Sequence, residues 1–312
     1  MTEDELALND LDTIVGEALE LLNAHQDYRV LRKMKTRDAF AESAGLTLSK
    51  GVIVDTETTG ANPAKDSIVE IGMILFEFDP ETGQAYRVLG AYDQLEDPGF
   101  SIPAEATKIH GITDDMVAGQ RIDDQAVSDF LNGVTLVVAH NAKFDRVCLE
   151  RRLPIFASLP WACSLTQVNW QEEGIGSAKL DYIAFQNGFF YDAHRAEEDC
   201  RAVLEILQKP LPVSGVLTMK AMLLNSAQNS YQVFATGAAF HTQDVLKARS
   251  YRWDPVKKSW HTTVVGEAAL DAEAAWLSSV VYLGKPARLA IELHTSLTRF
   301  SSREGVRGVR DV

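Results

Sequence analysis

Three short clusters of acidic and polar residues carry the side chains best suited to chemistry. In chain order they read Asp-Thr-Glu-Thr-Thr-Gly, His-Asn-Ala-Lys-Phe-Asp and His-Arg-Ala-Glu-Glu-Asp. Together they supply four carboxylates and a titratable imidazole: Asp55, Glu57, Asp145, Asp199 and His194. Hard divalent cations such as Mg²⁺ prefer oxygen ligands, and phosphate cleavage between two metal ions needs several carboxylates from different elements. The set therefore favours phosphodiester hydrolysis.

The first cluster follows a short apolar segment. Residues 51–55 are expected to form a buried strand, and successive side chains of a strand alternate between its faces. Asp55 and Glu57 should therefore point the same way at the end of this strand. Two neighbouring carboxylates repel each other unless a cation lies between them. A solvated strand end would also explain Asp55 and Glu57. The pair therefore indicates a metal site only together with the other two clusters.

The other two clusters are expected where a loop meets a helix. Asn141 is a candidate N-cap, with Asp145 in the early turns of the helix that follows. His194 and Asp199 are five positions apart, which on one continuous helix would place them on different sides. They converge if His194 lies on the preceding loop, where it could act as a general base for water. The alternative is an exposed histidine before an acid-rich helix start, which the helix dipole favours.

Strands and helices alternate through the middle of the chain. Residues 68–78 and 85–92 are expected to form the second and third strands of a meander, and residues 134–138 a further strand before the second cluster. Helices are expected around and between the clusters, near 103–109, 113–118, 123–131, 142–151, 164–171, 179–186 and 196–207. The pattern predicts a mixed sheet of about five strands flanked by helices, an α/β architecture.

The regions on either side of this α/β region are expected to form separate parts. The main domain is predicted over 49–209, after an N-terminal helical extension at 1–48 and before a small C-terminal α+β unit at 210–312, which follows a Pro-rich and Gly-containing segment. In the extension we expect an amphipathic helix over 4–24, packed on the main domain, and a short helix near 38–44. The last dozen residues are expected to form a flexible tail.

The C-terminal unit mixes cations with aromatic side chains. We expect strands at 231–236, 250–254, 258–264 and 287–294, and helices at 242–249 and 267–282. Cations and rings alternate in one stretch, namely Lys247, Arg249, Tyr251, Arg252, Trp253, Lys257, Lys258 and Trp260. Such a mix can follow a nucleic-acid backbone while its rings stack on bases. The alternative is a hairpin whose Trp side chains form its own core.

Charge and composition limit the partners. Taken alone, the net charge of −14 argues against a nucleic-acid partner, but the distribution of charge weakens that argument. Residues 211–312 nevertheless carry 12 Lys or Arg and 8 Asp or Glu, a balance of +4, against −18 for the first 210 residues. Part of the acidity of the first 210 residues would belong to a metal site, where bound cations reverse the local sign.

No targeting or membrane segment is recognisable in the sequence. There is no run of about 18 apolar residues that could span a membrane. The acidic start does not resemble a secretory signal. Three cysteines are too few and too irregularly spaced for a disulfide framework or a zinc site. We therefore expect a cytoplasmic protein with reduced thiols.

The order and spacing of the three clusters resemble the DEDDh 3′–5′ exonuclease superfamily, and are similar to the DNA polymerase III epsilon subunit and its stand-alone bacterial relatives. The resemblance covers about residues 50–208, and the segment Ile109-His110-Gly111-Ile112-Thr113 strengthens it. It implies a ribonuclease-H-like fold and metal-dependent hydrolysis of DNA from the 3′ end to 5′-mononucleotides, with two Mg²⁺ or Mn²⁺ ions and a role in DNA repair or replication.

The resemblance also implies a role for each signature residue. Asp55 would bridge both ions, while Glu57 and Asp199 would complete the site that holds the attacking water. Asp145 would support the second ion through water, and His194 would take the proton of the attacking water. Further residues would grip the terminal nucleotide: Thr56, Thr58, His110, Asn141 and Phe144.

The expected partner is single-stranded DNA or a DNA 3′ end. RNA remains an alternative substrate, because nothing in the sequence says how the 2′-hydroxyl is treated. Association with a polymerase is not indicated, since the family's polymerase-docking tail has no clear counterpart here. A non-catalytic nucleic-acid-binding scaffold is the alternative from another class, and the intact carboxylate set argues against it.

Overall fold

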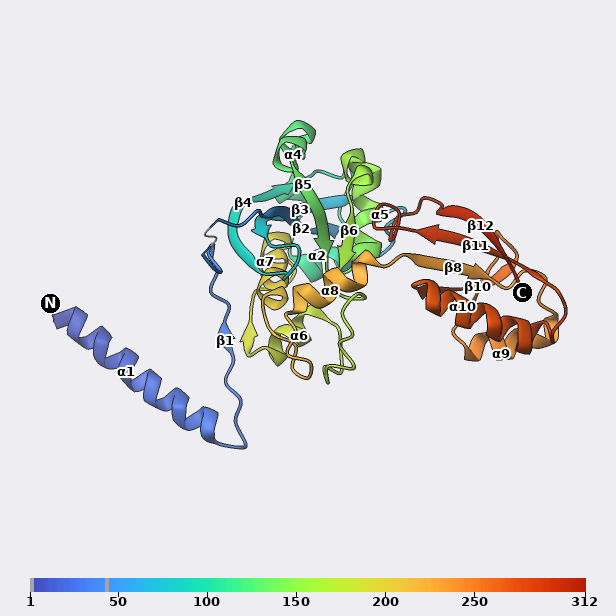
Figure 1. Cartoon of the computed structure of the whole chain (residues 1–312). Coiled ribbons are helices and arrows are strands. Elements are labelled where there is room, and N and C mark those ends of the chain that lie inside the picture. Colours follow the sequence, from blue (N-terminus) through green and yellow to red (C-terminus); the bar gives the residue numbers. More distant parts are fainter. Residues whose placement is uncertain (1–2, 43–44) are drawn as a thin grey trace.

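The computed structural model describes the backbone of residues 3–42 and 45–312, and the side chains of these ranges from residue 13 onward. Within this part of the chain, two five-stranded sheets organise the molecule (Figure 1). A short parallel pair, β1 (Arg32–Lys33) with β7 (Phe189–Phe190), ties the N-terminal extension to the main body.

The first sheet is mixed and has the order β4-β3-β2-β5-β6. Strands β3 and β4 run antiparallel to their neighbours, whereas β5 and β6 continue parallel to β2. The bounds are β2 (Ser49–Thr58), β3 (Ile68–Phe78), β4 (Ala85–Leu95), β5 (Val134–Ala139) and β6 (Trp161–Cys163). In chain order this is a 3-2-1-4-5 arrangement, which confirms the predicted ribonuclease-H-like α/β sheet.

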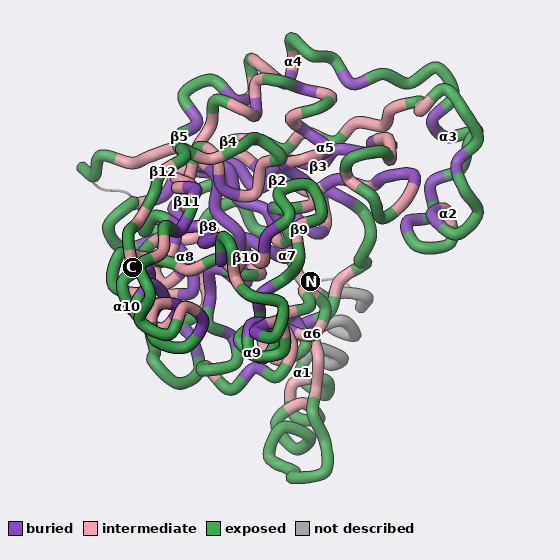
Figure 2. Tube along the Cα trace, turned by 90° about the vertical axis from the view of Figure 1, so that its right-hand side faces the viewer, coloured by how far each residue is buried: buried purple, intermediate pink, exposed green. Residues whose placement is uncertain are grey.

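Both faces of this sheet are buried because the side chains of β2 alternate between two apolar cores. Ile53 packs into one core with residues of a covering helix such as Val203, while Val52 and Val54 pack into the other with Leu149. In Figure 2 the buried residues (purple) follow these strands, and exposed residues (green) follow the outer helices and loops. Asp55 and Glu57 lie two and four positions after Ile53 on the same strand, so their side chains are on the same face of the sheet as Ile53.

Helices surround the first sheet within the described ranges. Their bounds are α2 (Ala104–His110), α3 (Asp114–Val117), α4 (Asp124–Phe130), α5 (Ala142–Arg152), the 3₁₀ turn Pro154–Ser158, α6 (Leu180–Gln186), α7 (Ala196–Leu207) and α8 (Thr218–Ala227). Helix α7 packs against β2 and β3 on the Ile53 face. Met219 and Met222 of α8 belong to the same core, so packing around the first sheet continues beyond Lys209.

The second sheet, the C-terminal sheet, is antiparallel throughout and has the order β12-β11-β8-β10-β9. Its strands and helices are β8 (Ser230–Phe234), the 3₁₀ turn Phe240–Thr242, α9 (Gln243–Ala248), β9 (Arg252–Asp254), β10 (Ser259–Val265), α10 (Glu267–Trp276) with a π-helical turn (Leu277–Val281), β11 (Arg288–His294) and β12 (Val306–Asp311). It has its own core, in which Val233, Leu246, Leu277 and Leu289 are buried.

Three sequence-based expectations about the helices and the tail are wrong. Residues 38–42 contain an isolated β-bridge from Ala39 to Arg87 instead of a helix, and 43–44 lie outside the described residues. Residues 164–171 form turns and bends that follow the end of β6 at Cys163. The last dozen residues are not a tail: β12 pairs along its whole length with β11.

The N-terminal helix does not pack on the main body in the part whose side chains are described. Helix α1 (Glu3–Ala24) extends away from the first sheet in Figure 1. Its apolar side chains are open to solvent: Ile14 is 61% exposed and Leu21 is 75% exposed. The predicted helix is therefore present, but its predicted packing is not.

Two compositional expectations can be compared with the structure. All three cysteines, Cys148, Cys163 and Cys200, lie in the described ranges, where they are buried and unpaired. Among the helices that the structure describes, none has both the length and the apolar character required to cross a membrane. The thiols are thus side chains of the core.

Candidate active site

The end of β2 presents two carboxylates on one face of the sheet. Asp55 and Glu57 are both half-buried. Across the ladder to β3, Asp55 lies opposite Gly72 and Glu57 lies opposite Glu70. The β2–β3 register shifts between Glu57 and Thr58, so regular pairing changes just beyond the second carboxylate.

Gly72 lets the first turn of α7 approach the sheet closely. A Cβ atom at this position would lie 2.3 Å from the carbonyl carbon of Ala196 and from the backbone nitrogen of Glu197. Real Cβ atoms do not come this close to backbone, so a larger residue would push α7 away. The glycine thus helps to position Asp199, which lies one turn into α7.

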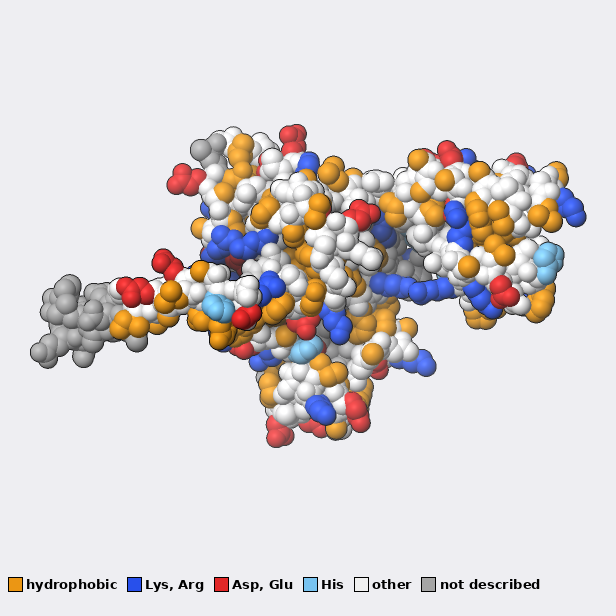
Figure 3. All heavy atoms as spheres, turned by 90° about the horizontal axis from the view of Figure 1, so that it is seen from below, with side chains coloured by type: hydrophobic (Ala, Val, Ile, Leu, Met, Phe, Trp, Pro, Cys, Tyr) orange, Lys and Arg blue, Asp and Glu red, His pale blue; other side chains and the backbone are white. Residues whose placement is uncertain are grey.

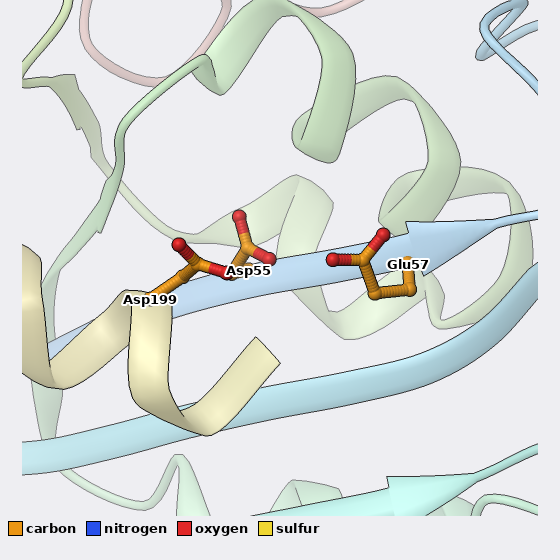
Figure 4. Close-up of side chains that lie close together, drawn as sticks. All are labelled: Asp55, Glu57 and Asp199. Carbon is orange, nitrogen blue, oxygen red and sulfur yellow. The ribbon is translucent and has the colours of Figure 1, made fainter. Parts of the chain in front are cut away.

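The three carboxylates from β2 and α7 form one cluster. One oxygen from each of Asp55, Glu57 and Asp199 lies within 4.8 Å of the other two. Figure 4 shows the Asp199 side chain reaching from α7 toward Asp55, with Glu57 further along β2. This is an all-oxygen donor set of the kind that Mg²⁺ and Mn²⁺ accept. The residues present therefore fit a hard divalent cation.

Mutual repulsion and burial make the cluster electrostatically costly without a cation. Burial raises the pKa of Asp55 well above its usual range, and the nearby charges of Asp145 and Asp199 raise it further. Burial, again with Asp199, raises the pKa of Glu57 to about 8. Burial also raises the pKa of Asp199. A bound divalent cation would favour the charged forms and offset this cost.

Asp145 lies near the cluster but is not one of its three members. It is 3% exposed in the first turn of α5, and burial raises its pKa to about 7. The Thr56 hydroxyl donates a hydrogen bond of 2.9 Å to Asp145 Oδ1. Asp145 raises the pKa values of both Asp55 and Glu57, so its charge acts on the cluster. The sequence therefore names all four acids, and the structure groups three of them directly.

His194 lies on the loop immediately before α7. Its side chain is exposed, and its backbone has φ of 67°, a left-handed conformation that is uncommon for residues other than glycine. The backbone N–H of His194 donates to Asp199 Oδ2 at 2.9 Å. This bond holds the loop beside the carboxylate cluster and leaves the imidazole free to face solvent. The position suits a mobile base.

The predicted nucleotide-gripping residues occupy mixed positions. Thr56 and Thr58 are buried, and their hydroxyls bond to Asp145 and to the Gly60 carbonyl, respectively. His110 is 5% exposed; its Nδ1 accepts from the N–H of Ile112, and its Nε2 has no hydrogen-bond partner among the described residues.

The other two candidates lie at the start of α5. Asn141 occupies the N-cap position but forms no side-chain cap hydrogen bond to the helix, and it is exposed. Phe144 is half-buried and packs against the core that contains Val52 and Leu149. Of the five gripping candidates, Asn141 is thus the one whose polar side chain is open to solvent.

Three residues that support the site were not singled out in the sequence. Tyr191 donates a hydrogen bond of 2.9 Å to Asp199 Oδ1. The fully buried carboxylate of Glu70 accepts from the Arg195 guanidinium at 2.8 Å and from the Ala196 N–H at 3.0 Å. These contacts fix the loop and the first turn of α7. The available signal in the sequence was that Arg195 directly follows His194 of the third cluster, but its partner Glu70 lies 125 positions earlier in the chain.

Comparisons with known proteins identify the family of this chain. The profile of the family described as Exonuclease matches residues 52–207. DNA polymerase III subunit epsilon of Treponema pallidum is 32% identical over 161 residues, which is 49% of this chain and 72% of that protein. DNA polymerase III PolC-type of Clostridium perfringens is 30% identical over 169 residues, but the match covers only 11% of that protein and 50% of this chain.

Solved structures of lower similarity are exonucleases too. Exonuclease X in complex with 5′ overhanging duplex DNA is 23% identical, with a TM-score of 0.39 over 57% of this chain and 92% of that one. The Escherichia coli ExoI–ssDNA complex is 18% identical, with a TM-score of 0.42 over 61% of this chain and 48% of that one. Because the family profile matches residues 52–207 and the Treponema pallidum protein is 32% identical, this chain belongs to the exonuclease family, a class of nuclease hydrolases.

The raised pKa values predict how the metal-free protein responds to pH. A carboxyl group whose pKa is raised by folding stabilises the folded state below its unfolded pKa, and that contribution is lost as pH rises through its folded pKa. For Glu57 and Asp145, whose folded values are about 8 and about 7, the loss falls between about pH 4 and pH 8. In a chelator, we expect the melting temperature to fall by roughly 10 °C between pH 5 and pH 8.

The control is the same pH series with millimolar Mg²⁺ or Mn²⁺, which should remove most of the fall. Asp55→Asn, which deletes one of the repelling charges, should flatten the metal-free slope. Differential scanning calorimetry gives both results. Equal slopes with and without the cation would contradict the interpretation of the carboxylates as a cation site.

Proposed function

We propose that this protein is a metal-dependent 3′–5′ exonuclease that hydrolyses DNA from the 3′ end to 5′-mononucleotides. The observation that carries the proposal is the carboxylate cluster of Asp55, Glu57 and Asp199 at the junction of β2 and α7. Membership of the exonuclease family supports it. The choice of DNA is supported by relatives that are named DNA polymerase III subunit epsilon and DNA polymerase III PolC-type.

The proposed cofactors are two Mg²⁺ or Mn²⁺ ions. Asp55, Glu57 and Asp199 would hold one directly, and Asp145 would serve the second with Asp55. Bound divalent cations would stabilise negative charge on the attacking and leaving oxygens. The donor chemistry fits, because every grouped ligand atom is a carboxylate oxygen.

The residues of the chain have distinct tasks in this proposal. His194, on the loop before α7, would take the proton of the attacking water as general base. Tyr191 and the His194 backbone N–H each bond one oxygen of Asp199 and hold that carboxylate in place. Arg195, paired with Glu70 of β3, would hold the loop that carries His194 against the sheet. Protonated His194 would then return its proton to solvent.

The test is a comparison of end-labelled substrates. Single-stranded DNA, a mismatched primer-template and RNA of the same sequence are incubated with the full chain and Mg²⁺ or Mn²⁺. We expect release of 5′-mononucleotides from the DNA 3′ end, and EDTA should abolish it. Faster release from RNA than from DNA would mean that the substrate is RNA. Binding without any release would instead favour a non-catalytic scaffold and would overturn the proposal.

A further inference from the structure

An aromatic pocket lies on the C-terminal sheet, outside the carboxylate site. Its volume is about 430 Å³, which is within the range of small-ligand sites. Trp253 of β9 and Trp260 of β10 form one wall, with ring centroids 5.7 Å apart at 62°. Phe240 and Lys258 also line the pocket, and Gln243 and Ser259 provide polar groups.

The rings of this pocket are exposed far more than a hairpin core would require. Trp253 is 50% exposed and Phe240 is 85% exposed. The core of the C-terminal sheet is formed by other side chains, among them Val233 and Leu246, which are fully buried. The alternative from sequence analysis, a hairpin whose Trp residues form its own core, therefore accounts for Trp260 in part but not for Trp253.

The cations of this region divide into two groups. Three cations are paired: Arg249 with Glu273 at 2.9 Å, Lys257 with Glu292 at 2.5 Å and Lys247 with Asp244 at 3.5 Å. The Tyr251 hydroxyl also donates to Glu273, at 2.8 Å. Those side chains stabilise the C-terminal sheet itself. Lys258 at the pocket and Arg252 on β9 have no ion pair among the described residues, so their charges are available to a ligand.

The C-terminal sheet is fastened to the helix that carries Asp145. Arg146 of α5 is fully buried and donates to the carbonyl oxygens of Ser296, Leu297 and Arg299, at 2.6 to 3.0 Å. These three residues follow β11 directly. The pocket-bearing sheet therefore has a fixed attachment to the exonuclease site.

Positive charge continues from the pocket toward that attachment. Burial lowers the pKa of His261 on β10; Asp254 opposes this, and the cations Lys257, Lys143 and Arg252 lower the pKa further. Lys143 is an exposed residue of α5, two positions from Asp145. Arg252 lies directly opposite His261 in the β9–β10 ladder, so this histidine has a cation beside it. Figure 3 shows Lys and Arg side chains (blue) at the junction between the main body and the C-terminal part.

From these features we infer that the pocket of Trp253, Trp260, Phe240 and Lys258 is a second substrate site, which stacks a base of single-stranded DNA upstream of the 3′ end held at the carboxylate cluster. The inference rests on the proposed exonuclease function. Exposed rings beside free cations suit an unpaired base and its phosphate, because every base has a face on which a ring can stack. A duplex would not fit, since its bases are already stacked.

The test measures binding by the full chain in the Asp55→Asn background, so that the strand is not degraded. Fluorescence anisotropy is recorded with oligothymidylates of about 6 and about 30 nucleotides and with a duplex. Trp253→Ala should weaken binding of the long strand about tenfold and leave the short strand and the duplex within twofold. Lys258→Ala should lower the slope of log affinity against log salt by about 0.7.

Two further variants guard against a folding defect. Phe240→Ala removes a ring that is 85% exposed and should also weaken binding of the long strand. Lys285→Ala removes an exposed cation that precedes β11 and does not line the pocket, and it should not weaken this binding. Equal affinity of all variants for the long strand would overturn the inference, as would an equal loss for the duplex. Absence of nucleotide release by the wild-type chain would instead count against the proposed function, and leave the binding result interpretable.

Discussion

Asp55→Asn should lower the rate of nucleotide release by at least about 10³-fold, because several kcal/mol of charge stabilisation are lost at about 1.4 kcal/mol per factor of ten. Asp55 is surrounded by other carboxylates, because Asp145, Asp199 and Glu57 all raise its pKa. Asparagine keeps the shape of the side chain but removes its charge. The measurement is kcat/KM for release of mononucleotides from a 3′-end-labelled strand.

The control for this variant is Asp192→Asn. Asp192 is exposed, and its ion pair among the described residues is with Lys33 on the surface, at 2.7 Å, so its loss should change the rate less than about twofold. Unfolding cannot explain the loss in Asp55→Asn, since removing one of several repelling charges should not destabilise the metal-free protein. Wild-type activity in Asp55→Asn would contradict the assignment of this carboxylate.

His194→Asn should lower turnover by about 10²- to 10⁴-fold, the usual contribution of a general base. Asparagine is the informative change, because it accepts the left-handed backbone at this position better than alanine does. It also retains the backbone N–H that bonds Asp199, so the carboxylate cluster should keep its geometry. Turnover is measured at saturating substrate across the neutral pH range.

Metal binding separates a proton-transfer role for His194 from a structural one. The affinity for Mn²⁺, followed by electron paramagnetic resonance, should stay within about twofold in His194→Asn, because the imidazole is not among the grouped ligands. His25→Asn, at another exposed histidine, is the matched control. Unchanged turnover would exclude His194 as the base.

Four strands of the first sheet, β2 to β5, could be predicted because their signals are local. The run over 68–78 is rich in β-branched and aromatic side chains, and β3 occupies that range. The acidic clusters could be placed for the same reason: the first at the end of β2, the second before α5 and the third before α7. Their convergence was predictable only in outline: which acids approach within 4.8 Å depends on the close packing of α7 on Gly72.

Elements whose stability comes from distant partners were missed. β6 has three residues, too few for an alternating pattern, and is held by its parallel pairing with β5. β12 alternates small, charged and apolar residues without an apolar period, and it forms because β11 offers a partner edge. Helix α8 follows a turn-rich segment and becomes stable by burying Met219 and Met222 in the first core.

The supporting contacts of the site could not be predicted for the same reason. The Arg195–Glu70 pair joins residues 125 positions apart, and neither residue type at its place signals the other. The exposed N-terminal helix illustrates the opposite case. Its apolar spacing predicts a helix correctly, but an amphipathic pattern does not say whether its apolar face is covered by the same chain.

The central claim is that acids from separate segments surround bound cations at the end of β2. Crystals of the full chain soaked in Mn²⁺, examined by anomalous scattering, test it most directly. We expect an anomalous peak coordinated by oxygens of Asp55, Glu57 and Asp199, and a second on the Asp145 side of Asp55. Manganese bound elsewhere, with these carboxylates left uncoordinated at saturating concentration, would contradict the account.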